Sequence, residues 1–221
     1  MNKRGLPEQA STVLRKLKKM LAQCNAVLAG GTAAALHLGH RLSKDLDFFT
    51  PTAFQNENIW AEIQRTGLPY KVIKEGPEFV IAEVNGIKWS LFQYPYPFLH
   101  PSKRVEGVRV AGLLDVAAMK VIAISQRGTK RDFVDLYFIL LQIPFHKIAA
   151  HMVEWFGVQR INPIHIGKAL VYFTDAESDP EPQFFPQQKV HWSRVKNFLQ
   201  DHVKQFVFDL DAAVRNAKRK K

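Results

Sequence analysis

The chain has 221 residues, 47% of them hydrophobic, which is enough for one large domain or two small ones around a buried core. It carries 31 Lys and Arg against 20 Asp and Glu, and this net charge of +11 favours a polyanionic partner such as a nucleotide or RNA. No run of about 18 apolar residues is present, so no membrane span is expected. With Cys24 as the single cysteine and no apolar stretch in residues 1–7, we expect no internal disulfide, no secretory signal and a cytoplasmic location.

The first half of the chain alternates between helical and strand patterns. Residues 8–23 have the apolar spacing of an amphipathic helix, and residues 26–29 form a short apolar strand that ends at Gly30 and Gly31. Further helices are expected over residues 32–38 and 54–65, and further strands over residues 45–49, 70–74, 79–84 and 87–92. Asn85-Gly86 joins the last two strands and is the strongest short signal for a hairpin.

The second half reads as helix almost throughout. Helical patterns cover residues 113–125, 131–141, 146–156, 164–172 and 192–217, and a Pro-rich, acidic loop at 175–188 that we expect to be solvated interrupts them. The sequence therefore predicts an α/β lobe over residues 1–112 and a helical lobe over residues 113–221.

Two short motifs in the first half carry chemistry. Gly30-Gly31-Thr32 lies between a strand and a helix, where backbone N–H groups and the helix dipole favour anions, although a Gly pair also simply lets a chain turn sharply. Asp45 and Asp47 are two residues apart on a predicted strand, so both carboxylates project to one side. Mg²⁺ is the expected ion there, because it takes hard oxygen ligands and joins carboxylates to substrate phosphates. The alternative is a solvated strand end with Leu46 and Phe48 turned inward.

Other polar residues fit either a site or ordinary structure. Arg41 and Ser43 lie in the loop ahead of the Asp pair, where a guanidinium would suit a triphosphate oxygen. The alternatives are that Arg41 is an ordinary surface arginine and that Ser43 simply closes a turn. Lys120 lies in an otherwise apolar helix, so its ammonium must either reach the surface or meet an anion. Residues 127–136 have a structural account as a helix end followed by a capped helix. No Cys/His cluster and no nucleophile–base pattern is legible, which argues against zinc and hydrolase chemistry.

Taken together, these segments resemble the AbiEii/AbiGii toxin family of nucleotidyltransferases. The segments that carry the resemblance are residues 28–36, residues 39–48, Lys120, Arg127-Gly128 and residues 131–136. Their order and approximate spacing match the family over residues 26–140. Members of the family look like minimal polymerase-β-type nucleotidyltransferases, with a mixed sheet flanked by helices and then a helical lobe. Several are toxins of toxin–antitoxin or phage-defence systems, and some transfer nucleotides to tRNA.

The resemblance implies roles for individual residues. Nucleotide phosphates would be held by residues of both halves: Gly30, Gly31, Thr32, Ser43 and Lys120. Mg²⁺ would be held by Asp45 and Asp47. Asp132 and Asp135 match the family's later Asp-x-x-Asp, one of which would act as a base or steady Lys120.

One departure concerns the third carboxylate, which polymerase-β-like enzymes usually carry on a neighbouring strand. The strand expected over residues 87–92 has no acid. Glu83, across the hairpin, is the nearest candidate in the first half, and Asp132 or Asp135 would replace it from the helical lobe.

The sequence thus predicts a Mg²⁺-dependent enzyme that moves an NMP from an NTP, such as ATP, GTP or CTP, to a hydroxyl acceptor and releases pyrophosphate. Transfer RNA or another RNA is an expected acceptor, and a cognate antitoxin protein is an expected partner. Two alternatives stay open. One is a catalytically inert relative that binds a nucleotide or a partner, and the other is a basic RNA-binding protein whose Asp pair is incidental.

Overall fold

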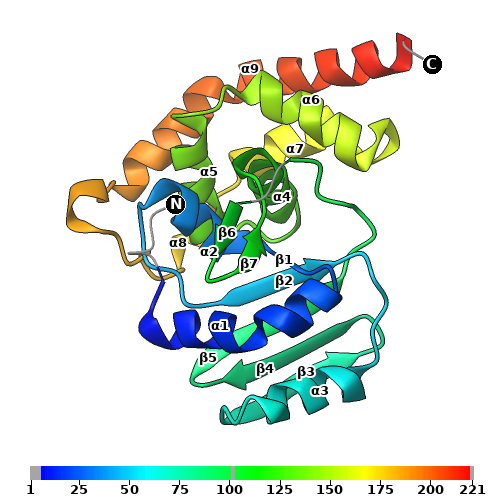
Figure 1. The fold of residues 1–221 in the computed structure, drawn as a ribbon. Helices are drawn as coiled ribbons and strands as arrows, with labels where there is room; N and C mark the ends of the chain where they lie inside the picture. Colours follow the sequence, from blue (N-terminus) through cyan, green and yellow to red (C-terminus); the bar gives the residue numbers. More distant parts are fainter. Residues whose placement is uncertain (1–5, 101–102, 220–221) are drawn as a thin grey trace. The chain divides into compact units, whose positions relative to one another are not determined.

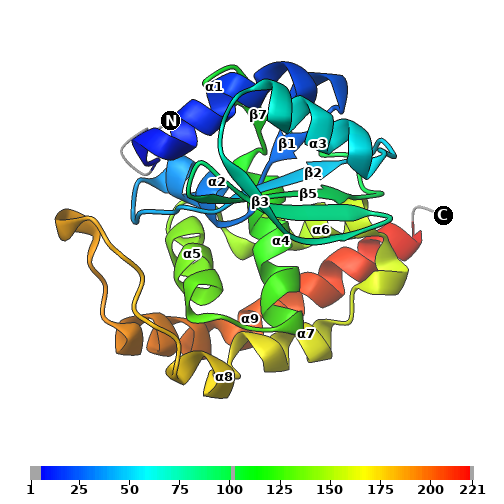
Figure 2. The ribbon, with the colours of Figure 1, turned by 90° about the horizontal axis from the view of Figure 1, so that it is seen from below.

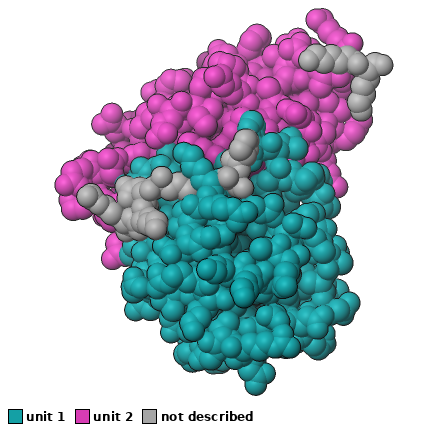
Figure 3. Space-filling view, viewed as in Figure 1, with its two compact units in different colours: residues 1–112 teal, residues 113–221 magenta. Residues whose placement is uncertain are grey.

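The computed structural model describes residues 6–100 and 103–219 (Figure 1). Most of the N-terminal segment considered above for a secretory signal lies outside these ranges. The chain divides into two compact units, Met1–Gly112 and Leu113–Lys221, which Figure 3 distinguishes by colour. The first unit is α+β and the second is helical.

The first unit is built on a seven-stranded mixed sheet with the strand order β3-β4-β5-β2-β1-β7-β6. Its strands are β1 (Val27–Leu28), β2 (Leu46–Thr50), β3 (Tyr70–Gly76), β4 (Phe79–Val84), β5 (Ile87–Gln93), β6 (Lys103–Val105) and β7 (Val108–Val110). β2 pairs antiparallel with β1 and parallel with β5, and β1 pairs parallel with β7. β2 therefore lies in the interior of the sheet, between two partners.

The helices of this unit are α1 (Glu8–Gln23), α2 (Gly30–Leu38) and α3 (Asn56–Arg65). α1 and α3 contact each other and cover one face of the sheet (Figures 1 and 2). Every second residue of the central strands is apolar and fully buried, as for Phe48 of β2 and Trp89 of β5, and these side chains form the core. The alternate residues lie on the opposite face, and Asp47 and Ser90 are among them.

Most predicted elements of this unit are confirmed. α1 has the predicted bounds, and Asn85 and Gly86 form the predicted hairpin with φ values of 52° and 74°. α2 begins at Gly30, so the Gly pair forms the first helical turn and not a turn before the helix. Asp45 lies one residue ahead of β2 and not in it. The β6–β7 hairpin was missed because two strands of three residues are too short to show a period.

The second unit contains α4 (Leu113–Gln126), α5 (Lys130–Leu140), α6 (Phe145–Phe156), α7 (Pro163–Leu170), α8 (Thr174–Glu177) and α9 (Trp192–Arg219). The long helix α9 packs against α5, α6 and α7. Within residues 6–100 and 103–219, no single helix is long and apolar enough to cross a membrane, although α5 and α6 together meet that criterion with a bend of 115° between them.

The loop expected to be solvated is anchored in part. Its first residues form α8, and the backbone N–H of Lys130 donates to the Asp179 carboxylate over 2.8 Å. The Lys130 ammonium also donates to the Asp179 carbonyl over 2.6 Å, and this lysine is only 5% exposed. The expectation of a wholly solvated loop is therefore wrong at Asp179, which binds the start of α5.

Candidate active site

The first turn of α2 is open to close approach by polar side chains. Gly30 has a φ of +63°, in the left-handed region that residues with a side chain avoid. A Cβ placed on Gly30 would lie 3.3 Å from Oδ2 of Asp47, and a Cβ on Gly31 would lie 2.7 Å from Nη2 of Arg41 and 3.4 Å from Oγ of Ser43. The two glycines thus allow a carboxylate, a guanidinium and a hydroxyl to reach the start of the helix.

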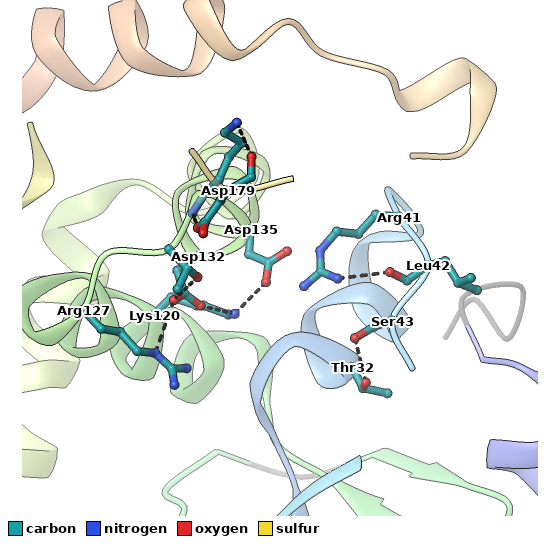
Figure 4. Close-up of polar contacts among 11 residues, drawn as sticks. Thr32, Arg41, Leu42, Ser43, Lys120, Arg127, Asp132, Asp135 and Asp179 are labelled. Carbon is teal, nitrogen blue, oxygen red and sulfur yellow. Dashed lines mark hydrogen bonds and ion pairs between the residues drawn. The ribbon is translucent and has the colours of Figure 1, made fainter. Parts of the chain in front are cut away.

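Hydrogen bonds hold the loop between α2 and β2 against this turn. The Thr32 hydroxyl is bonded to Oγ of Ser43 over 2.9 Å (Figure 4). It is also bonded to the backbone carbonyl of Asp45. The Arg41 guanidinium donates to the carbonyl of Leu42 over 3.1 Å (Figure 4). Thr32, Arg41 and Ser43 are all buried. The alternative of a surface arginine is therefore wrong, since Arg41 is only 3% exposed.

Asp47 is oriented by the neighbouring strand. In the parallel pairing of β2 with β5, Asp47 lies opposite Ser90, and the Ser90 hydroxyl donates to Oδ1 of Asp47. Oδ2 of the same carboxylate is the atom beside Gly30. The backbone carbonyl of Asp47 accepts from the N–H of Ala29 over 3.0 Å, which ties β2 to the residue before α2. The Asp47 carboxylate is thus held by Ser90 at Oδ1, while Oδ2 points toward the start of α2.

Ser90 occupies the neighbouring-strand position where a third carboxylate was expected. Glu83 lies on β4, two strands away from β2, and opposite Lys88. Strand spacing and rise place its Cα about 12 Å from that of Asp47, too far for a shared ion. Glu83 is also exposed. Sequence reasoning missed Ser90, because a serine in an apolar strand gives no signal until its strand partner is known.

A second polar cluster lies inside the helical unit. The Lys120 ammonium of α4 lies 2.8 Å from Oδ1 of Asp132 and 2.6 Å from Oδ2 of Asp135, both on α5 (Figure 4). The two aspartates are three residues apart, so they share one face of the helix. All three side chains are buried. Lys120 therefore meets two anions and does not extend its ammonium to the surface.

The environment of Asp132 favours its ionised form. Burial by itself raises the pKa of this carboxyl, but the charge and hydrogen bond of Lys120 and a hydrogen bond from Thr129 reverse that effect and lower the pKa below its ordinary value. The Thr129 hydroxyl donates to Oδ2 over 2.7 Å. The Arg127 guanidinium lies 3.7 Å from the same oxygen but is mostly exposed, so it adds little. The cluster is thus an ammonium held between carboxylates.

The predicted site residues fall into one group in each unit. The group of the first unit comprises Gly30, Gly31, Thr32, Arg41, Ser43, Asp45 and Asp47, and the group of the second comprises Lys120, Asp132 and Asp135. The second unit also holds a buried pair that the sequence did not suggest. Oδ1 of Asp115 on α4 lies 2.7 Å from Nε2 of His151 on α6.

Comparison with known proteins agrees with this architecture. The chain belongs to the family described as nucleotidyl transferase AbiEii toxin, type IV toxin–antitoxin system, whose model matches residues 12–103 and 90–216. It is therefore a nucleotidyltransferase of that family, and the predicted resemblance and α+β fold class are confirmed. It is 34% identical over 209 residues to the uncharacterized protein aq_aa25 of Aquifex aeolicus strain VF5, in an alignment that covers 88% of this chain and 99% of that protein.

Two solved structures share the fold. JHP933 from Helicobacter pylori is 19% identical with a TM-score of 0.56, and the match covers 97% of this chain and 98% of that chain. MenT4, a nucleotidyltransferase toxin from Mycobacterium tuberculosis H37Rv, is 17% identical with a TM-score of 0.58, over 93% of this chain and 91% of that chain. At these identities the likeness shows the fold, and the roles of individual residues rest on the geometry described above.

Proposed function

We propose that the chain transfers an NMP from an NTP to a hydroxyl of an RNA acceptor, with tRNA the first to test, in a Mg²⁺-dependent reaction. The acceptor oxygen attacks the α-phosphorus, the bond from that phosphorus to the pyrophosphate oxygen breaks, and the hydroxyl proton passes to water. The observation that supports this most is the approach of the Asp47 carboxylate to the start of α2, where a Cβ on Gly30 would lie 3.3 Å from Oδ2. Nucleotidyl transfer needs a phosphate site and a metal-binding carboxylate side by side, and we assign these roles to the helix start and to Asp47.

The triphosphate-binding role is proposed for the start of α2. Gly30 and Gly31 present backbone N–H groups at a helix N-terminus, where phosphates bind well. The buried guanidinium of Arg41 lies beside Gly31, and its paired N–H donors match the spacing of phosphate oxygens. Thr32 and Ser43 hold the loop that carries Arg41. We therefore assign phosphate binding to this turn and to Arg41, with Thr32 and Ser43 as positioning residues.

Asp45 and Asp47 are the proposed ligands of Mg²⁺. Carboxylate and hydroxyl oxygens are the hard donors that Mg²⁺ takes, so Asp45, Asp47 and the hydroxyl of Ser43 suit the ion by residue type. When bound, the ion would neutralise charge that develops on the phosphates. The chain's own contribution is positioning, because Ser90 holds Oδ1 of Asp47 while Oδ2 stays beside Gly30.

Lys120 is the proposed phosphate-binding lysine of the helical unit. Of the two roles that the family resemblance left open for Asp132 and Asp135, steadying Lys120 fits better. A carboxyl group whose pKa is lowered and which faces an ammonium is a weak base, as Asp132 is here. We therefore propose that the pair orients the Lys120 ammonium.

The test is transfer of label from each α-labelled NTP in the presence of Mg²⁺, with and without total tRNA. We expect label on RNA with the wild type and none with the Asp45→Ala/Asp47→Ala variant. The variant must keep the circular dichroism and melting temperature of the wild type. Label on protein would support NMP transfer but would show that the acceptor is a protein and not RNA. Absence of any label from a folded protein that still binds NTP would contradict the proposal.

The family description also motivates a proposed partner, a cognate antitoxin protein, in the cytoplasm. If the chain is a toxin whose effect depends on transfer, its expression should slow bacterial growth, and Asp47→Ala should relieve the effect at equal protein level. If wild type and Asp47→Ala slow growth equally, toxicity does not depend on NMP transfer.

A further inference from the structure

The sheet face that carries Asp47 continues across β5, β4 and β3 beyond the candidate site. The strand register places Ser90 opposite Asp47, Ile81 opposite Ser90 and Lys74 opposite Ile81. Side chains directly opposite each other in a sheet lie on the same face. The Lys74 side chain therefore shares a face with the proposed metal-binding carboxylate.

A row of phenylalanine rings runs beside this row on the same face. Phe49 lies opposite Phe92, and Phe92 lies opposite Phe79. The Phe49 and Phe92 rings are stacked with centroids 5.5 Å apart, and the Phe92 and Phe79 rings are stacked with centroids 6.4 Å apart. All three rings are partly exposed. The ammonium of Lys74 lies 5.6 Å from the centroid of Phe79.

Lysines lie on the other side of the Asp47 row. Lys88 of β5 is opposite Glu83 of β4, which is opposite Lys71 of β3. Lys71, Lys74 and Lys88 are exposed. Apart from Asp47, Glu83 is the one acid among the residues of β2 to β5 on this face. The face is thus cationic as well as aromatic.

Part of this arrangement has a structural purpose. A Cβ on Gly76 would lie 2.6 Å from the Phe79 ring, so this ring covers the glycine and shields its strand. That accounts for Phe79 but not for the three exposed lysines on the same face. On the opposite face, β4 and β5 carry apolar, buried residues such as Val80, Ala82 and Trp89. The residues of β3 on that face are exposed, but no lysine of β3 to β5 lies there.

We propose that this lysine–phenylalanine face (Lys71, Lys74, Lys88, Phe79 and Phe92) binds the acceptor as single-stranded nucleic acid next to Asp47. The lysines contact backbone phosphates and the partly exposed rings stack on bases, which is how proteins bind single strands without reading their sequence. Strand spacing puts the Phe79 backbone about 10 Å from β2, a span of one or two nucleotides. The inference rests on the proposed function, because it supplies the acceptor site for the same reaction.

The test measures binding of a fluorescein-labelled single-stranded RNA octamer of mixed sequence by anisotropy, without NTP or Mg²⁺. The Lys71→Ala/Lys74→Ala/Lys88→Ala variant should bind at least about tenfold more weakly than the wild type. The matched control is Lys16→Ala/Lys18→Ala/Lys19→Ala on α1, which removes the same charge from exposed lysines of the helix over the other face. Equal weakening by both variants, or no weakening by either, would overturn the proposal.

A second pair of variants tests the rings. Phe92→Leu should weaken binding of the octamer several-fold, whereas Trp60→Leu should not, because Trp60 of α3 stacks on Tyr70 at the opposite face. Both variants must keep the melting temperature of the wild type. Equal weakening of octamer binding by both variants would refute the proposal that bases stack on Phe92. Displacement of the RNA by an acidic peptide of equal charge as readily as by unlabelled RNA would also overturn the proposal, in favour of a protein partner.

Steady-state kinetics separates this inference from the proposed function. In transfer assays, the lysine variant should raise KM for the RNA acceptor and leave KM for NTP unchanged. If the wild type transfers NMP and the lysine variant has the same KM for RNA, the proposed acceptor face is refuted and the proposed NMP transfer stands. If RNA binding depends on this face but no NMP is transferred, the face stands as an RNA-binding site and the proposed transfer is refuted.

Discussion

At the scale of single residues, the candidate site depends on Gly30 because this residue has no side chain. Gly30→Ala would strain the backbone, because φ is +63°, and would press a methyl group against Oδ2 of Asp47. We expect a loss of about 1–2 kcal/mol in the free energy of unfolding. We also expect NMP transfer to fall at least tenfold. Urea denaturation and the labelled-NTP assay measure the two effects.

Gly67 offers a matched control for this prediction. Its φ is +71°, but a Cβ there would meet nothing within 4 Å. Gly67→Ala should therefore cause a similar loss of stability and leave transfer unchanged. If the two variants lose activity in parallel, the effect of Gly30→Ala comes from stability and not from the site.

Ser90 is the other residue whose role follows from a single contact. Its hydroxyl donates to Oδ1 of Asp47, the proposed metal ligand. Removal of a hydrogen bond that orients a metal ligand typically weakens metal affinity or activity by about 10–100-fold. Ser90→Ala should accordingly shift the Mg²⁺ concentration for half-maximal transfer upward. An unchanged Mg²⁺ dependence would mean that the hydroxyl only fills space.

At the scale of elements, the ion cluster between α4 and α5 should be important for stability. Lys120→Met would leave the buried carboxylates of Asp132 and Asp135 without a cation, which we expect to cost about 3–5 kcal/mol at pH 7. Chemical denaturation of the wild type and the variant measures the difference. A loss below 1 kcal/mol would mean that water or another cation replaces the lysine.

The pH dependence of this effect has a defined sign. The folded state lowers the pKa of Asp132, so the stabilisation is present above the ordinary value of 3.8 and is lost as pH falls through the folded pKa. Without Lys120, burial is left to raise the pKa of this carboxyl. The difference in the free energy of unfolding between wild type and Lys120→Met should therefore become smaller as pH falls from 7 to 5. A difference that stays constant over this range would contradict the assignment.

The loop after α8 is attached to the start of α5 by Lys130. Its ammonium and backbone N–H both bind Asp179, and it lies 5.7 Å from the centroid of the Trp192 ring. Lys130→Ala should free residues 179–189 and make them the first site of limited trypsin or chymotrypsin cleavage. Lys168→Ala, on the exposed side of α7, is the control and should leave the cleavage pattern unchanged.

At the scale of the whole molecule, the net charge of +11 predicts salt-dependent affinity for RNA. If three phosphates are contacted on a single strand, a fourfold rise in salt should weaken binding by about 20-fold. The lysine-face variant should show a shallower slope of log affinity against log salt. An affinity indifferent to salt would mean that the charge serves solubility and not RNA binding.

Much of the fold was legible in the sequence, because its elements obey local rules. α1 keeps the predicted bounds since its apolar residues recur with the helical period, and the Asn85-Gly86 turn is favoured by its own backbone preferences. The β6–β7 hairpin and the attachment of Asp179 to Lys130 were not legible. Three-residue strands carry no period, and a carboxylate 49 positions away in the chain gives no local sign of its partner.

The sequence by itself determined the family and the fold class, because motif order and hydrophobic periodicity are properties of the chain read locally. Only the tertiary structure decided that Ser90 stands beside Asp47, that Lys120 lies between two carboxylates, and that Glu83 lies two strands away. The physical reason is that such contacts depend on strand register and helix packing. These are set by burial of the whole apolar core, and no short segment encodes them.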